Sequence, residues 1–165
     1  MHQYRVTKYD PRYRKSSGAF TRDDWICVGD IGSTFSGTVL TASEYLAVEN
    51  AYVASALAFL AETGVESLAI CSFENHGSYA NSELSLDDGR ECSLLEVADI
   101  ARLNLRSSIW CRLVADNAFL HFGYDYYMYV GVPTSRGVLA CSLNRLNLRT
   151  SKRETAEYGG TVVRR

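Results

Sequence analysis

Residues 109–132 read IWCRLVADNAFLHFGYDYYMYVGV, and most of the predicted sheet depends on this stretch. It is rich in β-branched and aromatic residues, and apolar and polar positions alternate along it, as they do in half-buried strands. The pattern predicts strands at 109–115, 118–123 and 126–132, with a turn at Asp116-Asn117 and an end before Pro133. Three such strands form either a meander or paired hairpins, so we expect an antiparallel sheet.

Two helices are predicted before this stretch, and each begins with a capping box. Thr41 and Glu44 begin a helix over about 42–63, and Ser93 and Glu96 begin another over about 94–106. Apolar residues recur three and four positions apart within both segments. Gly64 suits the left-handed conformation in which helices commonly end.

Further strands are predicted at 4–9, ended by Asp10-Pro11, and at 67–73. We expect Trp25, Ile26 and Ile31 to anchor the connection 12–37 to the core. The fold class is therefore α+β: a single domain over residues 1–148, with an antiparallel-rich sheet and two main helices packed on it. We expect a short helix within 135–148, and a basic, flexible C-terminal tail over 149–165.

Charge is distributed unevenly along the 165 residues, although the formal net charge is only −2. Residues 1–36 carry +2, residues 101–165 carry +6, and the acidic segment, residues 37–100, carries −10 with Arg90 as its single basic residue. A composition that is 47% apolar and 22% charged is typical of a globular protein and excludes wholesale disorder.

We expect a cytoplasmic protein without a membrane span. No apolar run approaches the roughly 20 residues of a membrane helix, and the first residues, MHQYRVTKYDPRYRK, lack the apolar core of a secretory signal. The five cysteines are odd in number and form no C-x-x-C pair, which favours reduced, mostly buried thiols.

Candidate catalytic residues are few. Cys71 and His76 suggest a thiol–imidazole pair, but a cysteine in a buried strand usually behaves as a small apolar residue. His121 alternates with apolar neighbours and has no second histidine at a useful spacing. The stretch 29–37 is glycine-marked but lacks the lysine of a phosphate-binding loop. We therefore expect no enzyme activity, no metal and no cofactor.

Two features point to binding instead. The acidic segment would attract a basic partner if its side chains share one face, although a merely solvated surface explains it equally well. Tyrosines also cluster, at 124, 126, 127 and 129. Alternation along a strand places two of them on each face, so that either two lie near the surface or both faces are packed in the core.

Scattered residues also follow a recognisable pattern over about 4–132. They are YRVTKYDP at 4–11, Arg14, Gly18, DDW at 23–25, DIG at 30–32, Tyr45-Leu46, Glu49, Tyr52 and YYMY at 126–129. This pattern resembles a family of small bacterial immunity proteins encoded in contact-dependent growth inhibition and polymorphic-toxin loci. After Pro133 the resemblance weakens.

The resemblance implies a protein that binds the C-terminal domain of a cognate toxin, often a nuclease, and neutralises it by stoichiometric occlusion. It carries over no binding residue. From surface chemistry we expect the contacts to come from the loop around 74–91 and from the tyrosine cluster. The predicted partner-binding residues are Glu74, Glu83, Asp87, Asp88, Glu91, Tyr124 and Tyr126.

Two alternatives remain. One is a small enzyme using His121 or the Cys71/His76 pair. The other is a nucleic-acid-binding regulator using the basic C-terminal third, which includes Arg145, Arg149, Lys152, Arg153, Arg164 and Arg165. A sequence pI near 5.9 argues against direct nucleic-acid binding as the main activity. The identity of the toxin and the oligomeric state stay open.

Overall fold

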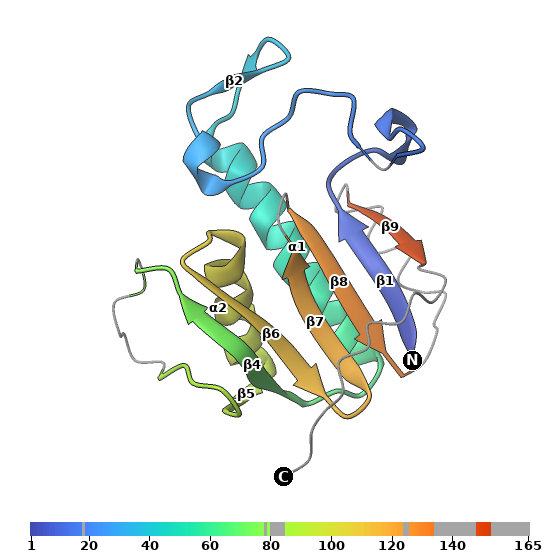
Figure 1. The fold of residues 1–165 in the computed structure, drawn as a ribbon, viewed down its shortest axis with the longest axis vertical. Helices are drawn as coiled ribbons and strands as arrows, with labels where there is room; N and C mark the ends of the chain where they lie inside the picture. Colours follow the sequence, from blue (N-terminus) through green and yellow to red (C-terminus); the bar gives the residue numbers. More distant parts are fainter. Residues whose placement is uncertain (18, 78, 80–84, 124–125, 134–147, 153–165) are drawn as a thin grey trace.

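Seven strands form one antiparallel sheet in the computed structural model (Figure 1). The structure describes residues 1–17, 19–77, 79, 85–123, 126–133 and 148–152. The strand order is β5-β4-β6-β7-β8-β1-β9. The strands are β1 (His2–Thr7), β4 (Ser67–Asn75), β5 (Glu91–Ser93), β6 (Ile109–Ala115), β7 (Ala118–Gly123), β8 (Tyr127–Val132) and β9 (Arg149–Lys152).

The stretch 109–132 forms the centre of this sheet as a meander of β6, β7 and β8. Leu113 lies opposite Leu120, and Leu120 opposite Val130, so the buried side chains form a row across three strands. Strand β8 begins at Tyr127, one residue later than predicted, because Tyr126 has a left-handed backbone with a φ of 59°. The predicted antiparallel order of the sheet is confirmed.

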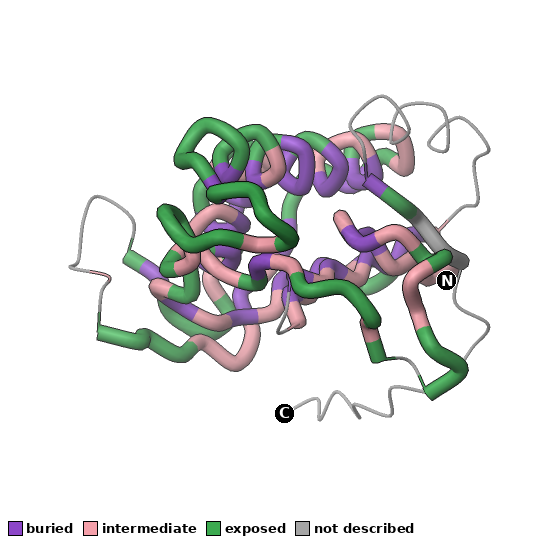
Figure 2. Tube along the Cα trace, turned by 90° about the horizontal axis from the view of Figure 1, so that it is seen from above, coloured by how far each residue is buried: buried purple, intermediate pink, exposed green. Residues whose placement is uncertain are grey.

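Helices α1 (Ala42–Glu62) and α2 (Leu94–Leu105) both pack on one face of the sheet (Figures 1 and 2). Both predicted capping boxes are present. At the start of α1, the Thr41 hydroxyl accepts from the Glu44 N–H at 3.2 Å, and the Glu44 carboxylate accepts from the Thr41 N–H at 2.9 Å. Ser93 and Glu96 do the same for α2. The predicted α+β class, a sheet with two helices packed on it, is therefore confirmed.

The core lies between the helices and the sheet. Tyr45, Tyr52 and Phe59 of α1 are buried against it, and the Tyr4 ring of β1 lies 5.1 Å from the Phe59 ring. Burial of each such large side chain contributes about 1.5–3 kcal/mol to stability. The helix-facing side of the sheet is thus filled. On the opposite side, which we call the open face, the described residues place no helix.

Residues 8–41 connect β1 to α1, and their described part forms short elements: 3₁₀ turns η1 (Pro11–Tyr13) and η2 (Val28–Asp30), and the two-stranded ribbon of β2 (Thr34–Phe35) and β3 (Thr38–Val39). Trp25 is buried, as predicted, between the rings of Tyr45 and Tyr126. The predicted anchoring by Ile26 and Ile31 is wrong, because these side chains are 47% and 38% exposed. The Ile26 N–H instead donates to the Asp30 carboxylate at 2.7 Å, a local contact at the protein surface.

The sheet continues past residue 148, where the sequence placed the end of the domain. Residues Arg149–Lys152 form β9 and pair antiparallel with β1, with Thr7 opposite Arg149 and Tyr4 opposite Lys152. This pairing is long-range and leaves no local signal in the sequence. The helix expected within 135–148 and the tail beyond Lys152 lie outside the described residues.

Candidate functional site

Three acids of the acidic segment have structural roles. Glu49 is buried in α1, and Arg106, after α2, donates from Nε and Nη2 to its two carboxylate oxygens, each at 2.7 Å. Glu44 and Glu96 are the capping acids of the two helices, and the N–H groups of Thr41 and Ser93 lower the pKa of their carboxyls. Glu49 is therefore inaccessible to a partner, and the carboxylates of Glu44 and Glu96 are engaged in capping.

Four other acids of the segment lie along one edge of the sheet. Glu74, Asp87, Asp88 and Glu91 are all exposed, and we call them the acidic edge. Glu91 lies in β5 opposite Ala69 of β4, Asp88 accepts from the Phe73 N–H of β4 at 2.8 Å, and Glu74 follows on the same strand. The turn at Asp87–Arg90, with Gly89 at a φ of 86°, brings the chain back onto β4, where the Gly89 N–H donates to the Ile70 carbonyl at 2.8 Å.

Little positive charge offsets this edge among the described residues. Arg90 lies in the turn, but its guanidinium is directed to Glu96 at the start of α2. The His76 ring lies 3.7 Å from the Glu74 carboxylate. Four of the five predicted acids are therefore together at the surface, and the fifth, Glu83, lies outside the described residues.

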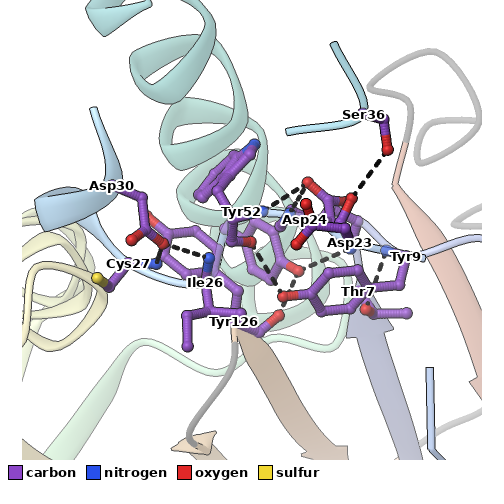
Figure 3. A network of polar contacts seen from close by, with 12 residues as sticks. Thr7, Tyr9, Asp23, Asp24, Ile26, Cys27, Asp30, Ser36, Tyr52 and Tyr126 are labelled. Atoms are coloured by element: carbon purple, nitrogen blue, oxygen red, sulfur yellow. Dashed lines mark hydrogen bonds and ion pairs between the residues drawn. The ribbon is translucent and has the colours of Figure 1, made fainter. Parts of the chain in front are cut away.

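The prediction that Tyr126 is an exposed anchor is wrong. Tyr126 is 4% exposed, and its ring packs edge-on against the rings of Trp25 and Tyr52. Figure 3 shows Tyr126 next to Tyr52. Its carbonyl accepts from the Tyr52 hydroxyl, and burial raises the pKa of its own hydroxyl. Its left-handed backbone takes it out of the strand alternation on which the prediction depended. Tyr124 lies outside the described residues.

The tyrosines on the open face are instead Tyr127 and Tyr129, which are both half-buried. Tyr129 lies opposite His121 of β7 and opposite Arg5 of β1, and His121 lies opposite Arg112 of β6. Residues directly opposite each other share a face. We call Arg112, His121, Tyr129 and Arg5 the cross-strand row; each is half-buried. Strand alternation predicted that 127 and 129 share a face, but not which face the helices cover.

Aromatic rings flank this row. The His121 ring lies 5.6 Å from the Trp110 ring and 5.8 Å from the Tyr129 ring. The Trp110 indole N–H donates to the Phe122 carbonyl at 3.1 Å, which holds the indole in place. Burial, with a smaller contribution from Arg112, lowers the pKa of His121. This histidine is therefore mainly the neutral imidazole at neutral pH.

The two arginines of the row have no carboxylate partner among the described residues. Arg112 donates from Nη2 to the Ser72 hydroxyl at 2.9 Å and contacts the Cys71 sulfur at 3.5 Å. The Cζ of Arg5 lies 5.4 Å from the centre of the Tyr127 ring. The Nε atoms of both arginines are shielded from solvent without a hydrogen-bond partner. The row is therefore electropositive.

Cys71 and His76 do not form a pair. Cys71 lies opposite Arg112, whereas Asn75, just before His76, lies opposite Ile109. Ile109 and Arg112 are three positions apart in β6, a distance of roughly 10 Å along a strand. The His76 Nδ1 is 3.2 Å from the Ser107 carbonyl, on the side away from Cys71. His76 is therefore not placed to act on the Cys71 thiol.

Other features of the described residues offer little for catalysis. Burial raises the pKa of Cys92 and raises that of Cys111 to about 11, so both thiols are protonated at neutral pH. Within the described part of the chain, no three His, Cys, Asp or Glu side chains could hold one metal ion. A cavity of about 170 Å³, lined by Cys27, His76 and Trp110 among others, is mainly apolar.

Among the described residues, no helix has the length and apolar character needed to cross a bilayer. Comparison of the chain with family models, with curated proteins and with solved structures finds no match. The geometry of the described residues leaves two candidate surfaces, the acidic edge and the open face.

Proposed function

We propose that this chain is an immunity protein that binds the C-terminal domain of a cognate toxin and neutralises it by stoichiometric occlusion. The observation that carries the proposal is the acidic edge. Glu74, Asp87, Asp88 and Glu91 are exposed together along β4 and β5, with no lysine or arginine paired to them among the described residues. The resemblance of residues 4–132 to immunity proteins supports the same function.

A basic toxin, in particular a nuclease, is the partner that this edge favours. Nucleases hold phosphates with lysine and arginine side chains, and a row of carboxylates offers those side chains a similar negative charge. Opposite potentials also raise the association rate of two proteins. The carboxylates bind by charge and hydrogen bonding, so the proposed function needs no catalytic residue, metal or cofactor. A cytoplasmic location, where an incoming toxin would act, is part of the proposal.

The test begins with the toxin domain at the C-terminus of the protein encoded immediately upstream of this chain. Co-expression of the two should restore growth of cells that the toxin domain alone arrests, and the purified proteins should form a one-to-one complex. Arrest that continues, together with the absence of a complex in calorimetry, would refute the proposed function.

The acidic edge is tested with the double variant Asp87→Lys, Glu91→Lys. We expect about tenfold weaker toxin binding and a smaller dependence of affinity on salt, because exposed charges act mainly through long-range attraction. Asp88 is left unchanged, since its carboxylate accepts from the Phe73 N–H. The matched control is Asp23→Lys, an exposed acid in the β1–α1 connection. Equal affinities for the double variant and the control would place the interface elsewhere.

A further inference from the structure

The open face of the sheet combines arginines and aromatic rings in a regular order. The cross-strand row runs over four adjacent strands as Arg112, His121, Tyr129 and Arg5, with an arginine at each end and two rings between them. Neighbouring strands are about 4.8 Å apart, so the two arginines are separated by roughly 15 Å. Trp110 borders the row on one side, in edge contact with His121.

A second aromatic side chain borders the row on the other side. Phe119 of β7 lies opposite Gly131 of β8 and packs directly over it, since a Cβ at Gly131 would be 2.3 Å from the Phe119 ring. Phe119 and Val114 lie opposite each other and are both half-buried. The open face thus presents aromatic surface at several positions around the row.

The two arginines of the cross-strand row favour the binding of an anion. Buried polar atoms nearly always have hydrogen-bond partners, so a shielded guanidinium nitrogen without one in the protein retains the capacity to donate to an anionic ligand. Arg5 and Arg112 both have such an atom at Nε, and the described residues supply no carboxylate to either side chain. The nearest acid by register is Glu74, which lies opposite Trp110 and next to His76, beyond the end of the row.

From this arrangement we propose that the open face binds single-stranded nucleic acid, with phosphates at Arg5 and Arg112 and bases against the rings between them. Alternating phosphates and planar bases match the alternation of guanidinium groups and aromatic rings. Base stacking on aromatic side chains, combined with backbone contacts to basic ones, is how open sheet faces bind single strands without reading sequence. This proposal for the open face does not depend on the function proposed for the acidic edge.

A protein ligand is less well matched to this row. Tyrosine, tryptophan and arginine are also common in protein interfaces, but a single carboxylate would satisfy only one end of the row. The sequence pI near 5.9 argued against nucleic-acid binding, but a pI sums the charges of the whole chain and so combines this face with the acidic segment. The four residues of the row carry two positive charges and no negative one.

Fluorescence anisotropy of labelled single-stranded U-rich RNA and dT oligonucleotides of about 12 nucleotides tests the proposal. Binding in the micromolar range is expected. With two phosphate contacts, affinity should fall about sevenfold between 50 and 200 mM salt, because each contact contributes about −0.7 to the logarithmic slope. No anisotropy change up to about 100 µM protein, the upper end of non-specific binding, would overturn the proposal.

Variants then locate the site. Arg5→Gln and Arg112→Gln should each weaken binding about tenfold and reduce the salt slope by about 0.7, whereas Tyr129→Ala should weaken binding without changing the slope. The matched control is Arg12→Gln, an exposed arginine paired with Asp10, which should bind as the unchanged chain does. Equal losses in Arg12→Gln and Arg112→Gln would overturn the placement.

Trp110 fluorescence reports on binding at the open face without any substitution in that face, so this measurement does not depend on whether the open-face variants fold. The chain has two tryptophans, and Trp25→Phe leaves Trp110 as the only one. Oligonucleotide addition should quench Trp110 fluorescence, and the absence of quenching under saturating conditions would overturn the proposal. Uridine monophosphate should compete only weakly; competition equal to that of the oligonucleotide would indicate a phosphate site instead of a strand-binding face.

Discussion

Replacement of Arg106 by methionine should destabilise the protein strongly, because it leaves the Glu49 carboxylate buried without its partner. Both Glu49 oxygens accept from Arg106 at 2.7 Å, and the Tyr45 hydroxyl adds a longer contact of 3.3 Å. The Glu49 side chain is 1% exposed, whereas the Arg106 side chain is 42% exposed. The pair joins α1 to the end of α2.

The magnitude follows from this asymmetry. Breaking a fully buried ion pair costs about 3–5 kcal/mol, and solvent around Arg106 screens part of that, so we expect a loss of about 2–3 kcal/mol. For a chain of this size each kcal/mol lowers Tm by about 2–4 °C, which predicts a decrease of about 4–12 °C. Urea denaturation and differential scanning calorimetry measure the two quantities directly.

The double variant Glu49→Met, Arg106→Met provides the decisive comparison. An apolar pair often replaces a buried ion pair at little cost, so the double variant should be more stable than Arg106→Met alone. The remaining loss comes from the Tyr45 hydroxyl, which loses its acceptor. Arg12→Met, which breaks the exposed pair with Asp10, is the matched control and should leave Tm unchanged. A double variant less stable than Arg106→Met would refute this explanation.

Three further predictions concern stability. Thr41→Ala removes the N-cap of α1 and should lower the free energy of unfolding by about 1 kcal/mol, measured in urea, whereas Thr41→Ser should restore it. Burial lowers the pKa of His121 in the folded protein, so protonation of this residue favours the unfolded chain. The free energy of unfolding should therefore fall as the pH decreases below about 6.5, the ordinary pKa of histidine. Urea denaturation at several pH values should show a weaker pH dependence of this free energy in His121→Gln. Gly131→Ala places a Cβ 2.3 Å from the Phe119 ring and should cost about 1–3 kcal/mol, most of which a second change, Phe119→Ala, should relieve; an unchanged Tm for Gly131→Ala would contradict the observed packing.

The elements themselves were predictable because their signals are local. The capping box at Thr41 lies within one turn of the helix that it begins, and the turn at Asp116-Asn117 joins the two strands that it separates. Alternation along 109–132 predicted both the strands and the sides of the sheet on which their residues lie. The α+β class follows from these signals together.

The candidate surfaces were only partly predictable. Glu74, Asp87, Asp88 and Glu91 are close together along the chain, so their convergence needed only one turn and one strand pairing. The prediction that Tyr126 is exposed was wrong because the left-handed backbone of this residue takes its ring out of the strand alternation and into the core.

The sequence alone located the two main helices and the strands β1, β4, β6, β7 and β8, and it showed that the negative charge is concentrated in one segment, because capping, periodicity and turn chemistry act over a few residues. Only the tertiary structure decided which face of the sheet the helices cover. It alone paired Glu49 with Arg106, 57 positions away, and placed Arg5 in one row with Arg112. Such contacts depend on strand order and helix packing, which minimise exposed apolar area over the whole chain and leave no local pattern.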